Sequence, residues 1–203
     1  MLAGTGCKTH SILADLGSAD SVETFVTEAK SALGAVDILI NNAGIIKRND
    51  SIDFTFDEWD SVMNVNLRTL FFLSQAVARE MIAASKGGKI VNIASMLSFQ
   101  GGIRVPSYTA SKSGVAGLTK ILANEWAKHG INVNAIAPGY FATNNTAALQ
   151  ADETRNTEIL GRIPAGRWGK PSDLGGAAVF LSSSASDYVQ GITLPVDGGW
   201  LAR

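Results

Sequence analysis

Residues 89–95 read Lys-Ile-Val-Asn-Ile-Ala-Ser, a short and mostly apolar run that ends in a polar residue. A run of this length, rich in β-branched residues, is typical of a buried strand. Residues 107–128 then predict a helix. A strand that is followed by a helix is the repeating unit of a parallel sheet, so this stretch favours an α/β fold.

The same alternation extends in both directions along the chain. Strands are predicted at residues 11–16, 36–40, 131–137 and 193–196. Helices are predicted from about Asp20 to Leu33, from Thr55 to about Ser85, and over residues 172–181. Residues 140–170 are polar with weak periodicity, which predicts a connection with one short helix. The 203 residues are expected to form a single domain, residues 1–203.

The composition argues against several classes of function. Hydrophobic residues make up 46% and charged residues 17%, which suits a chain with a buried core. The formal net charge is −1, so no basic excess is present to bind nucleic acid phosphates. No apolar run approaches the roughly 20 residues that a membrane span needs. Cys7 is the single cysteine, which predicts a reducing, cytoplasmic location, and with only His10 nearby no metal site is expected.

Polar residues follow several predicted strands, at the edge where parallel sheets bind their ligands. Asn41-Asn42-Ala43-Gly44, Ser95 and Pro138-Gly139 all stand there. Tyr108 and Lys112 are four residues apart in a predicted helix, so their side chains project from one face and are able to act together. A binding site for a small ligand is therefore predicted at this edge.

In this order the motifs resemble the short-chain dehydrogenase/reductase family, from about residue 10 to the C-terminus. The resemblance depends on Asn41-Asn42-Ala43-Gly44, Asn66, Ser95, the Tyr108/Lys112 pair, and Pro138-Gly139 with Thr143. It implies a Rossmann-like, doubly wound parallel sheet. It also implies an enzyme that transfers a hydride between a nicotinamide cofactor and a secondary alcohol or ketone.

The resemblance implies a role for each of these residues. Tyr108 would exchange a proton with the substrate oxygen, because a neighbouring cation, Lys112, favours the phenolate of a group whose ordinary pKa is about 10. Ser95 would orient the substrate, and Asn66 would hold a water that relays protons from Lys112. The expected cofactor is NAD, with NADP as the alternative. Its expected binding residues are Asp15, Leu16, Asn42, Ala43, Gly44, Tyr108, Lys112, Pro138, Gly139 and Thr143.

Within that family, residues 92–112, 138–146 and 196–203 are similar to a branch that acts on keto-deoxy sugar acids of the 2-dehydro-3-deoxy-D-gluconate or 2-deoxy-D-gluconate type. Such an acid needs a cation for its carboxylate and amides or hydroxyls for its alcohols. The expected substrate residues are Arg48, Ser95, Gln100, Arg104, Tyr108, Asn144 and Asn145. Arg104 lies four residues before Tyr108 and can reach the substrate mouth, although a merely solvated Arg fits equally well. The family also implies a homotetramer that forms contacts through two long helices.

The chain departs from the family at its start. A complete member begins with a strand, a Gly-rich phosphate turn, a helix and a second strand. We expect this chain to lack that first strand-helix-strand unit, so that residues 11–16 would be the third strand of the order 3-2-1-4-5-6. Residues 36–40 would then present an exposed apolar edge.

Three interpretations of this chain remain open. The first is an N-terminally truncated oxidoreductase, and the second is a non-catalytic module that has lost cofactor binding. The third is another reaction of the same family, such as reduction of a 3-oxoacyl carrier protein or of another sugar or polyol. The complete set of Asn66, Ser95, Tyr108 and Lys112 favours the first over the second. The balanced charge offers no basic docking patch for an acyl carrier, which disfavours the third.

Overall fold

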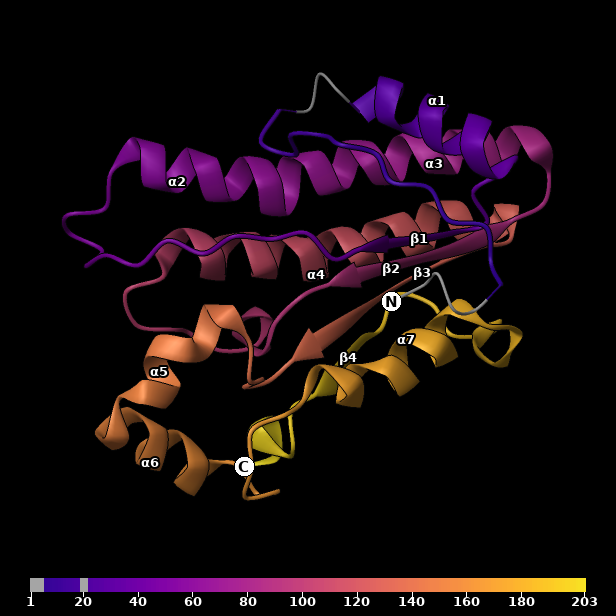
Figure 1. Cartoon of the computed structure of the whole chain (residues 1–203). Coiled ribbons are helices and arrows are strands. Elements are labelled where there is room, and N and C mark those ends of the chain that lie inside the picture. Colours follow the sequence, from indigo (N-terminus) through magenta and orange to yellow (C-terminus); the bar gives the residue numbers. More distant parts are fainter. Residues whose placement is uncertain (1–5, 19–21) are drawn as a thin grey trace.

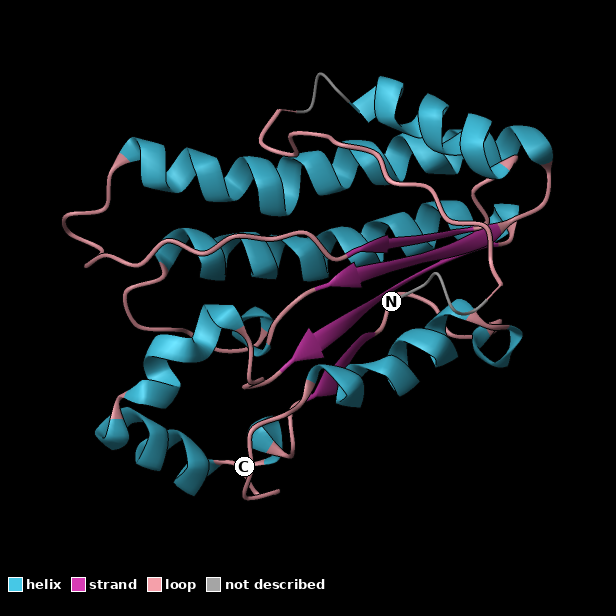
Figure 2. Cartoon of the chain, in the orientation of Figure 1, coloured by secondary structure: helices cyan, strands magenta, loops and turns pink. Residues whose placement is uncertain are grey.

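The sheet is parallel throughout the part of the chain that the computed structural model describes, residues 6–18 and 22–203. Its strands are β1 (Ile38–Asn41), β2 (Gly88–Ile93), β3 (Ile131–Pro138) and β4 (Thr193–Val196), in the order β1-β2-β3-β4. Figure 2 shows these strands between layers of helices. The order and direction confirm the predicted α/β fold, with the strands predicted at residues 36–40, 131–137 and 193–196 shifted by two residues at most.

Helices cover both faces of the sheet (Figure 1). On one face lie α1 (Val22–Leu33), α3 (Leu70–Ala84) and α4 (Pro106–Trp126), and α2 (Phe56–Met63) extends the line of α3. On the other face lies α7 (Gly175–Ser182). Two short helices, α5 (Ala147–Ala151) and α6 (Glu153–Arg162), stand beyond the carboxyl end of β3.

The core follows from the alternation of side chains along β2. Ile90 packs with α3 and α4 residues in one apolar cluster, whereas the next residue, Val91, packs on Leu181 of α7 in another. Both valine and isoleucine are completely buried. A strand with apolar residues on both faces has to lie between two helix layers, which explains why residues 89–94 are apolar almost without interruption.

The long helix predicted from Thr55 to Ser85 forms with one interruption. Thr55 Oγ1 accepts a hydrogen bond from Glu58 N at 3.2 Å, and Glu58 Oε2 accepts one from Thr55 N at 2.9 Å, so the predicted capping box is present. Residues Asn64–Thr69 form a π-helical segment between α2 and α3. Such a segment widens a helix locally and is frequent at functional sites.

Residues 11–16 do not form the predicted strand. Strand hydrogen bonds need a neighbouring strand, and in the described residues β1 pairs with β2 alone. Leu13 is fully exposed, and in the described residues no apolar side chain of the segment is buried in the core. The predicted helix that follows is present as α1, although its expected first residue, Asp20, lies outside the described residues.

The edge of β1 is apolar and exposed, as predicted. Ile38 and Ile40 are 47% and 45% exposed, while Leu39 between them packs into the core. In the described residues no strand covers the free edge of β1. Such an edge is a site where another chain can add a strand.

The connection between β3 and α7 contains more helix than predicted. The prediction was one short helix, but the segment contains a 3-10 turn at Asn144–Thr146 and then α5 and α6. Asp152 caps α6, because its Oδ1 accepts a hydrogen bond from Arg155 N at 3.0 Å. Within α6 only Ile159 is buried, so the sequence carries too few apolar positions to reveal the helix by periodicity.

Candidate active site

The polar residues predicted at the strand ends do lie at one edge of the sheet. Asn41 ends β1, Ser95 follows β2, and Pro138 ends β3. Asn41 Nδ2 donates to Ser74 Oγ of α3 and to Asn92 Oδ1 of β2, each at 2.9 Å. These buried hydrogen bonds hold the end of β1 in a defined position beside β2 and α3.

Asn66 lies in the π-helical segment and is completely buried. Its Nδ2 donates to Ile45 O at 2.9 Å and to Ser111 Oγ at 3.2 Å, and its Oδ1 accepts from Ile45 N at 2.8 Å. The side chain thereby connects three segments: the π-helical segment, the turn after β1, and α4. One acceptor position of Oδ1 remains unused.

Ser95 occupies the second position after β2, where it caps a 3-10 turn. Its Oγ accepts a hydrogen bond from Leu97 N at 3.2 Å, and its side chain lies near enough to the Tyr108 hydroxyl to lower the pKa of that group. The bond from Leu97 N uses one lone pair of Oγ. The hydroxyl proton of Ser95 is still able to donate to a ligand oxygen or to Tyr108.

Tyr108 and Lys112 lie one turn apart on α4, with Lys112 Nζ 5.6 Å from the centroid of the Tyr108 ring. Lys112 is 3% exposed, and its Nζ donates to Ile93 O at 2.6 Å. A protonated amine has three N–H donors, and in the described residues Ile93 O is the one acceptor that Lys112 Nζ contacts. Two donors therefore remain for a ligand.

Burial changes the acidity of both groups. It lowers the pKa of Lys112 to about 8, because a charged amine is poorly solvated inside the protein. It raises the pKa of Tyr108, and the nearby Ser95 side chain and the positive charge of Arg48 offset only part of that effect. In this structure Tyr108 is therefore a neutral phenol at neutral pH, the form that gives up a proton to a ligand oxygen.

Gly44 lies beside Lys112 and Asn66, in the turn after β1. A Cβ added to Gly44 would lie 3.6 Å from Lys112 Nζ and 3.4 Å from Asn66 Oδ1. The missing side chain therefore leaves room directly above the two unused donors of Lys112. Asn42 and Ala43, the other cofactor candidates in this turn, are exposed.

The remaining cofactor candidates lie outside this turn: one set lies at and after the end of β3, and the other precedes α1. Gly139 is needed for close packing, since a Cβ there would lie 2.6 Å from Asp197 Cα. Thr143 begins the 3-10 turn at Asn144–Thr146, and its backbone N donates to Thr146 Oγ1 at 3.1 Å. Asp15 accepts a hydrogen bond from Gly17 N at 2.8 Å in a turn, and Leu16 beside it is half-buried.

Arg48 is a substrate candidate whose charge reaches Tyr108. Its Nη2 donates to the backbone oxygen of Asn145 at 3.1 Å, which joins the turn after β1 to the segment before α5. Its charge acts on the hydroxyls of both Tyr108 and Tyr140, because it lowers the pKa of each. The side chains of Asn144 and Asn145 are exposed next to it.

Arg104 and Gln100 make contacts that the sequence did not indicate. Arg104 has a left-handed backbone, with φ of 62°, and its Nε lies 2.9 Å from Asp50 Oδ1. Its guanidinium therefore points to an exposed loop. Gln100 Oε1 accepts a hydrogen bond from the indole of Trp200 at 3.1 Å.

Two serines that the sequence analysis did not select support the centre. Ser111 Oγ receives the hydrogen bond from Asn66 and donates to Tyr108 O at 2.8 Å. Ser98 Oγ donates to Lys112 O at 2.6 Å. Ser111 lies three residues after Tyr108, on the same face of the helix, and this spacing was the available signal.

Comparison with known proteins identifies the chain's relatives. The family profile described as enoyl-(acyl carrier protein) reductase matches residues 2–201. The chain is 65% identical, over 198 residues, to 2-dehydro-3-deoxy-D-gluconate 5-dehydrogenase of Escherichia coli (strain K12), covering 98% of the chain and 78% of the relative. It is 63% identical to the protein of the same name from Dickeya dadantii (strain 3937), covering 100% of the chain and 80% of the relative.

A solved structure adds a bound cofactor to the comparison. It is the crystal structure of a gluconate 5-dehydrogenase from Burkholderia cenocepacia J2315 in complex with NADP and tartrate. Its TM-score is 0.90 at 44% identity, and the match covers 94% of this chain and 74% of that one. In the described part of this chain, no helix is both long enough and apolar enough to cross a membrane.

Proposed function

The chain belongs to the short-chain dehydrogenase/reductase family, and from that premise we propose that it is a nicotinamide-dependent oxidoreductase of keto-deoxy sugar acids. The names of its relatives support this proposal, since two proteins more than 60% identical to it are 2-dehydro-3-deoxy-D-gluconate 5-dehydrogenases. A gluconate 5-dehydrogenase with NADP bound supports a nicotinamide cofactor. The substrate would be a sugar acid whose secondary alcohol and ketone forms are interconverted.

The observation that carries the proposal is the arrangement of Ser95, Tyr108 and Lys112. Ser95 lies near enough to the Tyr108 hydroxyl to lower its pKa, so the two hydroxyls would bind one substrate oxygen together. In the direction of reduction Tyr108 would give its proton to the ketone oxygen while Ser95 holds that oxygen in place. A bound nicotinamide would supply the hydride. Lys112 would bind the cofactor ribose with its two unused donors, and its charge would stabilise the phenolate that remains.

Asn66 would act by holding the centre together and by binding a relay water. Its contacts with Ile45 and Ser111 use both of its N–H donors and one acceptor position. The remaining acceptor position of Oδ1 lies next to Gly44 and is the place where a water could bind. Such a water would return a proton to Tyr108 by way of Lys112.

Arg48 is the cation that we propose for the substrate carboxylate. It lies close enough to Tyr108 for its charge to act on that hydroxyl, and a guanidinium suits a carboxylate because it can donate two parallel hydrogen bonds. Asn144 and Asn145 would bind the substrate hydroxyls, and Gln100 would bind a further oxygen of the substrate. Arg104, which is paired with Asp50, would be the outer and weaker of the two cationic candidates.

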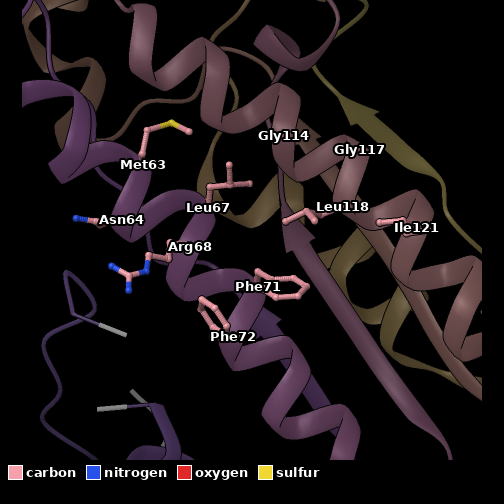
Figure 3. A pocket seen from close by; sticks show the side chains of 10 residues that line it. All are labelled: Met63, Asn64, Leu67, Arg68, Phe71, Phe72, Gly114, Gly117, Leu118 and Ile121. Atoms are coloured by element: carbon pink, nitrogen blue, oxygen red, sulfur yellow. The ribbon is translucent and has the colours of Figure 1, made fainter. Parts of the chain in front are cut away.

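A homotetramer is the proposed assembly, with α3 and α4 at one contact. Figure 3 shows Leu67, Phe71 and Leu118 beside a shallow hollow between these helices, together with Gly114 and Gly117. The hollow measures about 620 Å³, and its lining is almost entirely apolar. A Cβ at Gly117 would meet nothing within 4 Å, so a larger side chain there would reduce the space for a partner without disturbing the chain itself. We expect light scattering to give four times the chain mass of 21.3 kDa for the wild type and a smaller mass for Gly117→Leu.

An activity assay with a small panel of substrates tests the proposed function. The purified chain is given NAD or NADP with 2-dehydro-3-deoxy-D-gluconate, an uncharged sugar of the same size, or a 3-hydroxyacyl carrier protein, and formation of reduced nicotinamide is followed by absorbance. We expect turnover with the sugar acid and at most weak turnover with the other two. Turnover with the acyl carrier protein alone would favour the alternative of a 3-oxoacyl carrier protein reductase.

A further inference from the structure

Trp200 lies in the turn that follows β4 and contacts several segments around the proposed active site. It is 5% exposed and packs with Met96, which follows Ser95, and with Ile159 and Ile163 at α6. Its ring also meets the Tyr140 ring edge-on, with centroids 4.8 Å apart and an interplanar angle of 63°. One indole therefore joins the connection after β2, the end of β3, and α6.

The indole makes one hydrogen bond, and this bond sets the orientation of Gln100. Trp200 Nε1 donates to Gln100 Oε1 at 3.1 Å. An indole N–H can only donate, so it selects the carbonyl oxygen of the glutamine amide and turns the amide nitrogen away. In the described residues no acceptor contacts Gln100 Nε2, so its two N–H donors are available for a ligand.

The indole cannot easily adjust its position, because contacts on several sides hold it. The Arg162 guanidinium lies over the ring, 4.1 Å from the centroid. Asp197 accepts hydrogen bonds from Gly199 N and Leu201 N, both at 2.9 Å, and so fixes the turn that carries Trp200. Arg203 Nη2 donates to Gly161 O at 2.8 Å and holds the C-terminus against α6.

We propose that Trp200 is a positioning residue that holds Gln100 as an N–H donor toward an oxygen of the bound sugar acid. The inference rests on the proposed function, since it assumes that the substrate lies between Ser95 and Gln100. A free glutamine amide presents its oxygen or its nitrogen about equally well, whereas the held amide keeps its oxygen on the indole and turns its nitrogen, with two donors, away from it. The held amide would favour an acceptor such as a carboxylate or keto oxygen over a group that donates.

Kinetics of Trp200→Phe and Gln100→Ala, alone and combined, test the proposal. Phenylalanine keeps a packed ring and removes the N–H donor. We expect Trp200→Phe to raise the KM for the sugar acid about fivefold, the effect of one modest hydrogen bond, with kcat changed less than about twofold. In the Gln100→Ala background the same change is expected to have no further effect on KM, because the residue through which Trp200 acts is gone.

Trp168→Phe is the matched control. Trp168 also meets Tyr140 edge-on, at 5.5 Å, but its Nε1 donates to Asn156 Oδ1 at 2.7 Å. We expect this variant to keep the KM of the wild type within about twofold. A merely structural role of Trp200 would instead lower kcat or thermal stability, and it would do so equally with Gln100 or Ala at position 100.

The indole N–H signal in a nitrogen-15 NMR spectrum provides a readout that does not depend on activity. The chain has four tryptophans, and Trp200→Phe identifies the signal of Trp200. We expect that signal to move on Gln100→Ala and on addition of the sugar acid. If the wild type does not bind the acid, the proposed function fails and the inference fails with it. If the wild type binds the acid and Trp200→Phe binds it equally well, the inference alone is overturned. It is also overturned if Trp200→Phe weakens binding of the acid by the same factor with Gln100 or Ala at position 100.

Discussion

The inner and outer halves of the proposed site are built in different ways. Asn66, Ser95 and Lys112 are buried, and each has a hydrogen bond to the backbone of a neighbouring element. Arg48 and Arg104 lie on exposed loops, and their contacts join one loop to another. The inner residues therefore keep their places as long as the sheet and α4 are folded, whereas the outer residues depend on how the loops meet.

This difference predicts different kinetic consequences for the two halves. A change in the inner half removes a group that acts on the reacting atoms, so it lowers kcat. A change in the outer half removes binding that substrate and transition state share, so it raises KM. Single substitutions in the two halves test this division.

Tyr108→Phe is expected to have the largest effect on turnover. Removal of the proton donor should lower kcat about a thousandfold. In the described residues its hydroxyl makes no hydrogen bond to the backbone, so the fold should survive the change. Steady-state kinetics together with circular dichroism measure both quantities. Turnover close to that of the wild type in a folded variant would exclude Tyr108 as the acid.

Lys112→Met should lower kcat about a hundredfold, because the phenolate loses the cation beside it. The same variant has a clear pH signature in stability. Burial lowers the pKa of Lys112 from 10.5 to about 8, so between these values the unfolded chain holds a proton that the folded chain has released. The free energy of unfolding of the wild type, relative to Lys112→Met, should therefore rise through this pH window by roughly 3 kcal/mol at most.

Urea unfolding of both proteins, for example at pH 7 and pH 10, measures that difference. Below pH 8 the buried charge destabilises the folded wild type by a constant amount, so the two curves should run parallel there. If the difference in unfolding free energy stays the same through the whole range, burial does not lower the pKa of Lys112.

Arg48→Met should raise the KM for the sugar acid about tenfold with kcat little changed, the effect of one charge-assisted contact. The KM for an uncharged sugar substrate should rise much less. The comparison of the two substrates is the control, because a general disturbance of the loop would weaken both. An equal rise in KM for both substrates would show that Arg48 does not bind the carboxylate.

Arg104→Met should have the smallest effect, a change in KM of about twofold or less. Its guanidinium is exposed and paired with Asp50, and an exposed ion pair contributes little. The same two substrates measure the effect. A selective tenfold rise for the acid would assign the carboxylate to Arg104 and would show that the loop moves when substrate binds.

The sequence predicts the elements inside the sheet and its helix layers better than the segment before α1. The strand at residues 89–94 and the capping box at Thr55 and Glu58 follow from local patterns, so both could be predicted before the structure. The segment at residues 11–16 has the local pattern of a strand but no partner to pair with, and its prediction was wrong. Whether a strand forms depends on a neighbouring strand to pair with, and the local sequence pattern carries no information about that neighbour.

The same limit applies to the candidate site. The order of Asn66, Ser95, Tyr108 and Lys112 along the chain is enough to select these residues. The contact of Gln100 with Trp200 joins positions 100 residues apart and leaves no periodic signal. The π-helical interruption at Asn64–Thr69 also leaves no signal in the sequence, since the apolar spacing of the long helix continues through it.

Transfer of a labelled hydride tests the central claim most directly. The sugar acid in its alcohol form, with deuterium on the carbon that bears the reacting hydroxyl, is mixed with oxidised nicotinamide and the purified chain. Mass spectrometry then measures deuterium in the reduced cofactor. The account predicts that the wild type transfers the label and that Tyr108→Phe does not. Absence of label in the cofactor with a wild-type chain that binds both ligands, or equal transfer by Tyr108→Phe, would contradict it.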